Sequence, residues 1–173
     1  MCFLQDISIV GDGQKWNLIP QWVNGGNITT KDMKMRINLA GLDAAPGVKP
    51  GFSRCDAIPQ SSAPIVLGPK QVSSVTFLTT PSEPFLGFQR GTIKKLYLWG
   101  RATYYDGFTI RPRITRFCFD IISILGNPTD SNANLRMLHT LCTESNCTDD
   151  ECDKEDNSLP PPVCPAPLFQ RAD

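Results

Sequence analysis

The residues with the clearest capacity for chemistry are three cysteines and a histidine near the C-terminal end of the chain. Cys142, Cys147 and Cys152 are spaced five positions apart, and His139, the sole histidine, precedes them. Thiolate sulfur and imidazole nitrogen are ligands that Zn²⁺ favours, so these four side chains are a candidate metal site or thiol-redox site. Paired Cys-x-x-Cys knuckles are absent from the sequence. Metal binding is therefore the less favoured interpretation of this group.

The same cysteines can instead form disulfide bonds. Cys118–Cys142 and Cys147–Cys152 are two such pairings, which an oxidising compartment would allow. The chain has seven cysteines, an odd number, so at least one thiol stays unpaired within a monomer. Free thiols are the third alternative, in which Cys118 is a small residue buried in a strand. The sequence leaves these alternatives open.

No set of residues for catalysis is evident. A Ser–His or Cys–His nucleophile pair would have to use His139, which lies beside the acidic end of the chain. The Gly-x-Ser-x-Gly elbow, the P-loop and the dinucleotide fingerprint are all absent. The acidic run from Asp149 to Asp156 lacks the central glycine and the glutamate spacing of a calcium loop. We therefore expect a protein that is not an enzyme and needs no cofactor.

Arginines and aromatic residues alternate around the segment 93–121, and they form a candidate binding surface. Its members are Trp99, Arg101, Tyr105, Arg111, Arg113 and Arg116. Arginine over an aromatic ring is a cation–π arrangement, and it is also seen at single-stranded nucleic-acid sites. Alternate aromatic residues in a central strand are more often core residues. We therefore expect an unidentified protein partner at this surface, and no nucleic acid.

The body of the chain has the period-two alternation of half-buried strands. Strands are expected at 3–10, 16–23, 33–39, 71–79, Ile93–Tyr105 and Arg113–Ile121. The last two should pair as an antiparallel hairpin. Residues 41–63, rich in proline and glycine, predict a long irregular connection, and 131–141 a short helix. These elements predict an all-β protein, an immunoglobulin-like antiparallel sandwich of about six to eight strands with an irregular C-terminal tail.

The formal net charge of zero conceals an uneven distribution. Residues 1–141 carry fifteen basic and nine acidic side chains, whereas residues 142–173 carry two basic and eight acidic ones. We interpret 1–141 as the β-sandwich domain and 142–173 as an acidic, Cys- and Pro-rich segment that is disordered from about 153. The acidic segment is expected to fold back near the arginine-rich hairpin.

Five stretches of the sequence resemble a family of uncharacterised proteobacterial proteins. They are Pro20–Asn27, Val66–Lys70, Leu96–Asp106, Ile114–Cys118 and Asn146–Cys152. Members of that family carry an N-terminal membrane segment followed by an immunoglobulin-like β domain. The resemblance implies a bacterial envelope protein with an interaction or structural role. This chain shows no signal peptide and no apolar stretch of about 18 residues, so membrane association is expected only through a segment absent from it.

Overall fold

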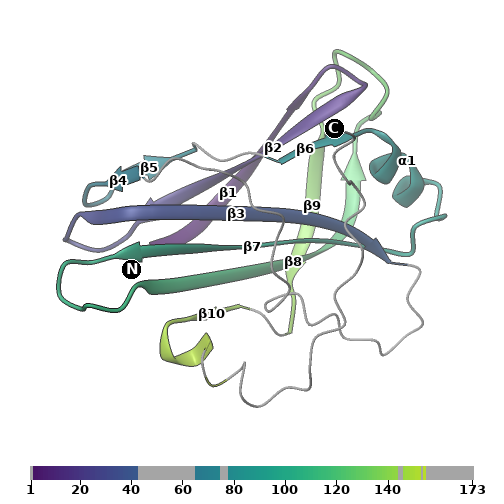
Figure 1. The fold of residues 1–173 in the computed structure, drawn as a ribbon. Helices are drawn as coiled ribbons and strands as arrows, with labels where there is room; N and C mark the ends of the chain where they lie inside the picture. Colours follow the sequence, from purple (N-terminus) through teal and green to yellow (C-terminus); the bar gives the residue numbers. More distant parts are fainter. Residues whose placement is uncertain (1, 43–64, 75–77, 144–145, 153, 155–173) are drawn as a thin grey trace, which may run out of the picture.

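The computed structural model describes residues 2–42, 65–74, 78–143, 146–152 and 154, which fold into two antiparallel β-sheets (Figure 1). In the four-stranded sheet, β2 pairs with β1 along its whole length and with β5 and β6 on its other side. Its strands are β1 (Cys2–Gly11), β2 (Lys15–Asn24), β5 (Val72–Ser73) and β6 (Leu78–Pro81).

The six-stranded sheet is built around three long neighbouring strands in the order β8–β7–β3. The short strand β4 pairs with β3, while β9 and β10 pair with successive parts of β8. Its strands are β3 (Thr30–Leu42), β4 (Ile65–Leu67), β7 (Lys95–Tyr105), β8 (Arg113–Leu125), β9 (Arg136–Leu141) and β10 (Cys147–Thr148).

The hydrophobic core lies between the two sheets and follows from the alternation in the sequence. Successive side chains of a strand point to opposite faces, so every second residue of β2, β3 and β7 enters the core. The core side chains include Trp16, Leu18, Trp22, Met33, Met35, Ile37, Leu96, Leu98, Ala102 and Phe117. The rings of Trp22 and Phe117 meet edge to face across the core, with centroids 5.6 Å apart. The other face of the six-stranded sheet points away from this core.

Most of the expected strands are confirmed. The predicted hairpin forms, with β7 and β8 paired antiparallel from Leu96 opposite Ile121 to Tyr104 opposite Arg113. The stretch 71–79 contains β5 and the start of β6, with 75–77 outside the described residues. Ten strands are present in the described parts of the chain, against about six to eight expected, because β4, β5 and β10 are only two or three residues long.

The short helix predicted at 131–141 is wrong. Arg136–Leu141 forms the strand β9, because β8 continues to Leu125 and offers an unpaired edge to it. Leu138 and Leu141 are exposed, so their helical spacing with Leu135 does not mark a buried helix face.

A short helix follows β6, outside all of the elements expected from the sequence. α1 (Glu83–Gln89) places Pro84 in its first turn, where the missing N–H of proline removes no helical hydrogen bond. Phe85 is fully buried in the core, and Gly91, with a φ of 73°, follows the helix. Pro84 therefore lies in the first turn of a helix that Phe85 anchors in the core.

Two expectations concern parts of the chain that the structure describes little or not at all. The long connection 41–63 lies outside the described residues, except for the end of β3 at Leu42. The predicted disordered tail also lies outside them, apart from residue 154. None of the helices in the described residues has the length and apolarity needed to cross a membrane.

Candidate binding surface

Three arginines stand side by side on neighbouring strands of the six-stranded sheet. Arg101 of β7 is directly opposite Arg36 of β3 on one side and Arg116 of β8 on the other. The neighbours of these arginines in sequence, such as Ile37 and Ala102, lie in the core, so the arginines belong to the outer face. We call Arg36, Arg101 and Arg116 the arginine row.

The arginine row concentrates positive charge along a line of adjacent strands about 4.8 Å apart. Three guanidinium groups in one register make this part of the outer face strongly basic. Each guanidinium group has five N–H donors in a planar fork that matches a carboxylate. Arg36 and Arg101 are partly exposed and Arg116 is buried, so Arg36 and Arg101 are the accessible members.

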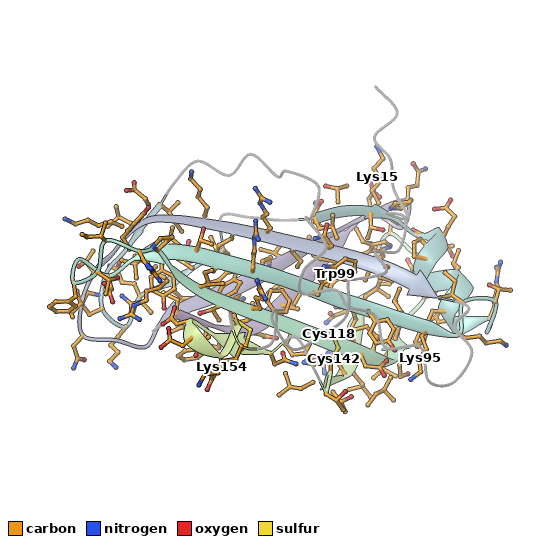
Figure 2. All side chains as sticks on the ribbon, turned by 60° about the horizontal axis from the view of Figure 1, so that its bottom comes forward. Lys15, Lys95, Trp99, Cys118, Cys142 and Lys154 are labelled. Carbon is orange, nitrogen blue, oxygen red and sulfur yellow. A yellow bond between two sulfur atoms is a disulfide. The ribbon has the colours of Figure 1, made fainter. Side chains whose placement is uncertain are left out.

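An apolar cluster borders the arginine row on one side. The next row of the sheet consists of Asn38, Trp99 and Cys118, and Trp99 packs with Cys118, Ala40 and Cys142. Figure 2 labels Trp99 on β7, Cys118 on β8 and Cys142 just after β9. Only 8% of Trp99 is exposed, so its ring supports the sheet and offers little surface for stacking a ligand.

A lysine lies on the other side of the arginine row. The row formed there by β3, β7 and β8 consists of Lys34, Thr103 and Ile114. Lys34 is exposed and adds a further cation beside Arg36. The outer face therefore carries four basic side chains on two consecutive rows, next to a firmly packed apolar cluster.

Two disulfide bonds lie near the C-terminal strands, and one of them joins β8 to the end of β9. Cys118 and Cys142 are bonded across a Cα–Cα distance of 5.4 Å, and Cys147 and Cys152 across 5.1 Å. The backbone N–H of Cys142 also donates to the carbonyl of Cys118 at 3.0 Å. Asn146 Oδ1 accepts from the N–H of Cys118 at 2.9 Å. Both pairings named from the sequence are therefore formed: Cys118–Cys142 joins β8 to the residue after β9, and Cys147–Cys152 joins β10 to the turn that follows it.

The alternative metal set does not assemble in this oxidised structure. Cys142, Cys147 and Cys152 are all disulfide-bonded. A cysteine binds a metal such as zinc as the free thiolate, so these three cannot serve as ligands while the bonds are intact. The ring of His139 packs against Phe119, with centroids 4.2 Å apart. No group of three potential metal ligands meets within the described residues. Cys2, a free cysteine, is buried in the core, and burial raises the pKa of its thiol to about 11.

The remaining arginines of the predicted surface lie at the hairpin connection, away from the arginine row. Arg113 binds Asp106 through Nε at 2.9 Å and Asp149 through Nη1 at 3.1 Å. Asp149 also accepts a hydrogen bond from the N–H of Ile114 at 2.8 Å. Arg111 is exposed in the connection itself, and Tyr105 is at the end of β7. The acidic segment thus reaches the hairpin at Asp149, as expected, but it meets Arg113 there.

The carboxyl group of Asp106 organises the hairpin connection. It accepts from the N–H groups of Phe108 at 2.9 Å and Thr109 at 3.3 Å. Hydrogen bonding from Phe108, followed by the Arg113 guanidinium, lowers the pKa of Asp106 to about 2. The charged carboxylate is therefore the form that the folded connection selects.

The first prediction concerns the titration of Asp106. Because its folded pKa lies below the unfolded value, its contribution to stability is complete above about pH 4 and is lost as the pH falls through 2. An NMR titration of the carboxyl carbon should give a midpoint near pH 2. Arg113→Ala should raise that midpoint only partly, because the N–H of Phe108 still donates. A midpoint near the ordinary value of 3.8 in the unmodified protein would contradict this assignment.

Sequence reasoning missed the contribution of β3 to this surface. Alternation in 33–39 does predict a basic outer face containing Lys34 and Arg36, but not which strand lies beside it. That information is in the pairing of β3 with β7.

Comparison of the chain with protein-family models, with curated proteins and with solved structures finds no match.

Proposed function

We propose that this protein is a non-enzymatic, immunoglobulin-like β-sandwich domain that binds an acidic segment of a partner protein at the arginine row. In this proposal it is related to bacterial envelope proteins and works in an oxidising compartment. The observation that carries the proposal is the register that sets Arg36, Arg101 and Arg116 opposite one another.

Carboxylates are the ligands that suit this geometry best. Side chains on one face of an extended peptide recur about every 7 Å, and long arginine side chains can adjust to that spacing. Charge-assisted hydrogen bonds from guanidinium to carboxylate are about twice as strong as neutral ones. An acidic polypeptide would therefore gain charge-assisted contacts at this face.

The aromatic residues argue against a nucleic-acid ligand. Non-specific binding of single strands depends on bases that stack on exposed rings. Trp99 is only 8% exposed and packs with Ala40 and Cys118. The two rows directly beside the arginine row therefore offer no exposed ring on which a base could stack, which favours carboxylates over bases.

The disulfides support a compartment in which thiols are oxidised. Structural disulfides persist mainly outside the cytosol. Cys118 is 1% exposed and Cys152 is 0% exposed, which is typical of structural bridges and unlike the accessible thiols of redox catalysts. This burial favours an interaction domain over the alternative of a metal-binding or thiol-redox protein.

The second prediction tests the binding surface with poly-L-glutamate as the probe. Arg36→Gln combined with Arg101→Gln should weaken its binding by about tenfold at 0.1 M salt, because two charge-assisted contacts are lost. The affinity of the unmodified protein should also fall between 0.1 and 1 M salt, as the Debye length shortens from about 10 to 3 Å. Fluorescence anisotropy of a labelled probe measures both effects.

A matched control removes the same net charge elsewhere. Lys15 on β2 and Arg90 after α1 are exposed and lie away from the arginine row. Lys15→Gln combined with Arg90→Gln should change the affinity by less than twofold. Equal weakening by the two double variants would show that binding follows net charge alone, and it would reject the arginine row as the site.

A further inference from the structure

The strand β1 offers a long edge on the side of the molecule away from the arginine row. It has ten residues, and in the described part of the chain β2 is the strand with which it pairs (Figure 1). At the start of β1 the N–H of Cys2 donates to Tyr104 Oη at 3.0 Å and its carbonyl accepts from Thr115 Oγ1 at 2.9 Å, whereas along Asp6–Val10 no second strand pairs with β1 among the described residues. Soluble proteins usually protect such an edge with charges, prolines or a covering segment. β1 contains one charged residue, Asp6, and no proline, while Phe3 and Val10 are 43% and 56% exposed.

The core is also incompletely covered along β1. Leu4, Ile7 and Ile9 pack against the core but are only partly buried. On the adjacent β2, Trp16 and Leu18 are fully buried. The difference follows from position, because β2 has neighbours on both sides. A strand added beside β1 would cover the remaining apolar surface of Ile7 and Ile9.

We infer that β1 pairs with β1 of a second copy of this chain, antiparallel and centred on Ser8. The regular part of β1 begins after a break in register between Leu4 and Asp6. A two-fold axis at Ser8 uses that regular part and places Ile7 opposite Ile9 of the partner subunit. Both residues face the core side of the sheet, so the two hydrophobic cores become continuous across the axis.

Charge selects this register over its neighbours. With the axis at Ser8, Asp6 lies opposite Val10 of the partner subunit. The two Asp6 carboxylates are then four residues apart along the strand, about 13 Å, which exceeds the Debye length of about 8 Å at physiological salt. An axis at Asp6 would instead set the two carboxylates directly opposite each other, which is destabilising. The pairing centred on Ser8 sets apolar Ile7 opposite Ile9 and keeps the two Asp6 carboxylates apart. A second copy of β1 therefore fits this edge.

Light scattering coupled to size exclusion tests the association. At about 100 µM the protein should have twice the monomer mass of 19.1 kDa. Ser8→Lys should make it monomeric, because two ammonium groups would meet at the axis. A monomeric mass for the unmodified protein would overturn the inference. A dimer that Ser8→Lys leaves unchanged would overturn it too, because its interface would lie elsewhere.

Cross-linking tests the register without relying on the lysine variant to fold. Ser8→Cys should form a disulfide-linked dimer under mild oxidation, because residues at a two-fold axis between antiparallel strands have Cβ atoms about 5 Å apart. Thr79→Cys is the matched control, an exposed position on β6 of the same sheet. Cross-linking of Ser8→Cys no greater than that of Thr79→Cys would reject the pairing. Both readouts are independent of the arginine row, so they can fail without affecting the proposed function.

Discussion

Replacing Cys118 and Cys142 together by alanine should lower the free energy of unfolding by about 3 kcal/mol. The bond joins residues 24 positions apart. Removing it frees the unfolded chain from this cross-link, which raises the conformational entropy of the unfolded state. It also removes sulfur atoms from the cluster around Trp99. For a protein of this size the melting temperature should fall by about 6–12 °C. Denaturant unfolding and calorimetry measure the two effects.

The second disulfide provides the comparison. Cys147 and Cys152 are only five positions apart, so the same entropy argument gives about 2 kcal/mol for their replacement by alanine. Reduction of the unmodified protein should lower stability by about the effects of the two bonds together. If the two double variants had equal stability, loop length would not determine the stabilisation. A Cys118/Cys142 variant as stable as the unmodified protein would show that the bond has no structural role.

Gly100→Ala should destabilise the protein by about 3 kcal/mol, because there is no space for a methyl group at this position. A Cβ there would meet the backbone carbonyl oxygen of Arg36 at 2.1 Å and a ring carbon of Phe117 at 2.6 Å. The carbonyl belongs to the paired strand β3, so relief requires β3 and β7 to move apart. Overpacking of this kind usually costs about 1–3 kcal/mol, and a backbone clash belongs at the upper end. Denaturant unfolding measures the change.

Gly87→Ala is the control for this substitution. Gly87 lies in α1, where a Cβ would meet flexible side-chain atoms of Ile93 and Thr92 at 3.0–3.1 Å. Alanine also favours a helix by about 1 kcal/mol relative to glycine, which offsets the closer contact. Its stability should therefore change by less than 1 kcal/mol. An equally small loss of stability for Gly100→Ala would contradict the close contact between β3 and β7.

Much of the fold could be predicted because alternation in the sequence records which side of a strand is buried. Met33, Met35, Ile37 and Leu39 repeat with a period of two, and all four enter the core. The same signal fails where it is ambiguous. Leu135, Leu138 and Leu141 fit a helical period, yet Leu138 and Leu141 are exposed on a strand. Residues 136–141 form a strand because they pair with the edge of β8. The local sequence pattern does not indicate that this edge is there.

The candidate site was only partly predictable for a related reason. Sequence reasoning selected Arg101 and Arg116, since both belong to one predicted hairpin. Arg36 is more than sixty residues from Arg101 and joins the row only through the register of β3 with β7. The register of β3 with β7 shifts between Lys31 and Lys34. Counting residues from the start of β3 would therefore not have placed Arg36 opposite Arg101. Site membership therefore depends on strand order and irregularities that short-range patterns do not encode.

The edge of β8 also has a consequence for the order of folding. β7 and β8 are joined by a short connection, so their pairing can form early. β9 and β10 occupy the outer side of β8 in succession, and Cys118 meets Cys142 between their two ladders. Docking of β9 on β8 holds the two thiols together and so favours their oxidation. The bond would therefore act as a late kinetic lock, slowing the detachment of the C-terminal strands more than it speeds their arrival.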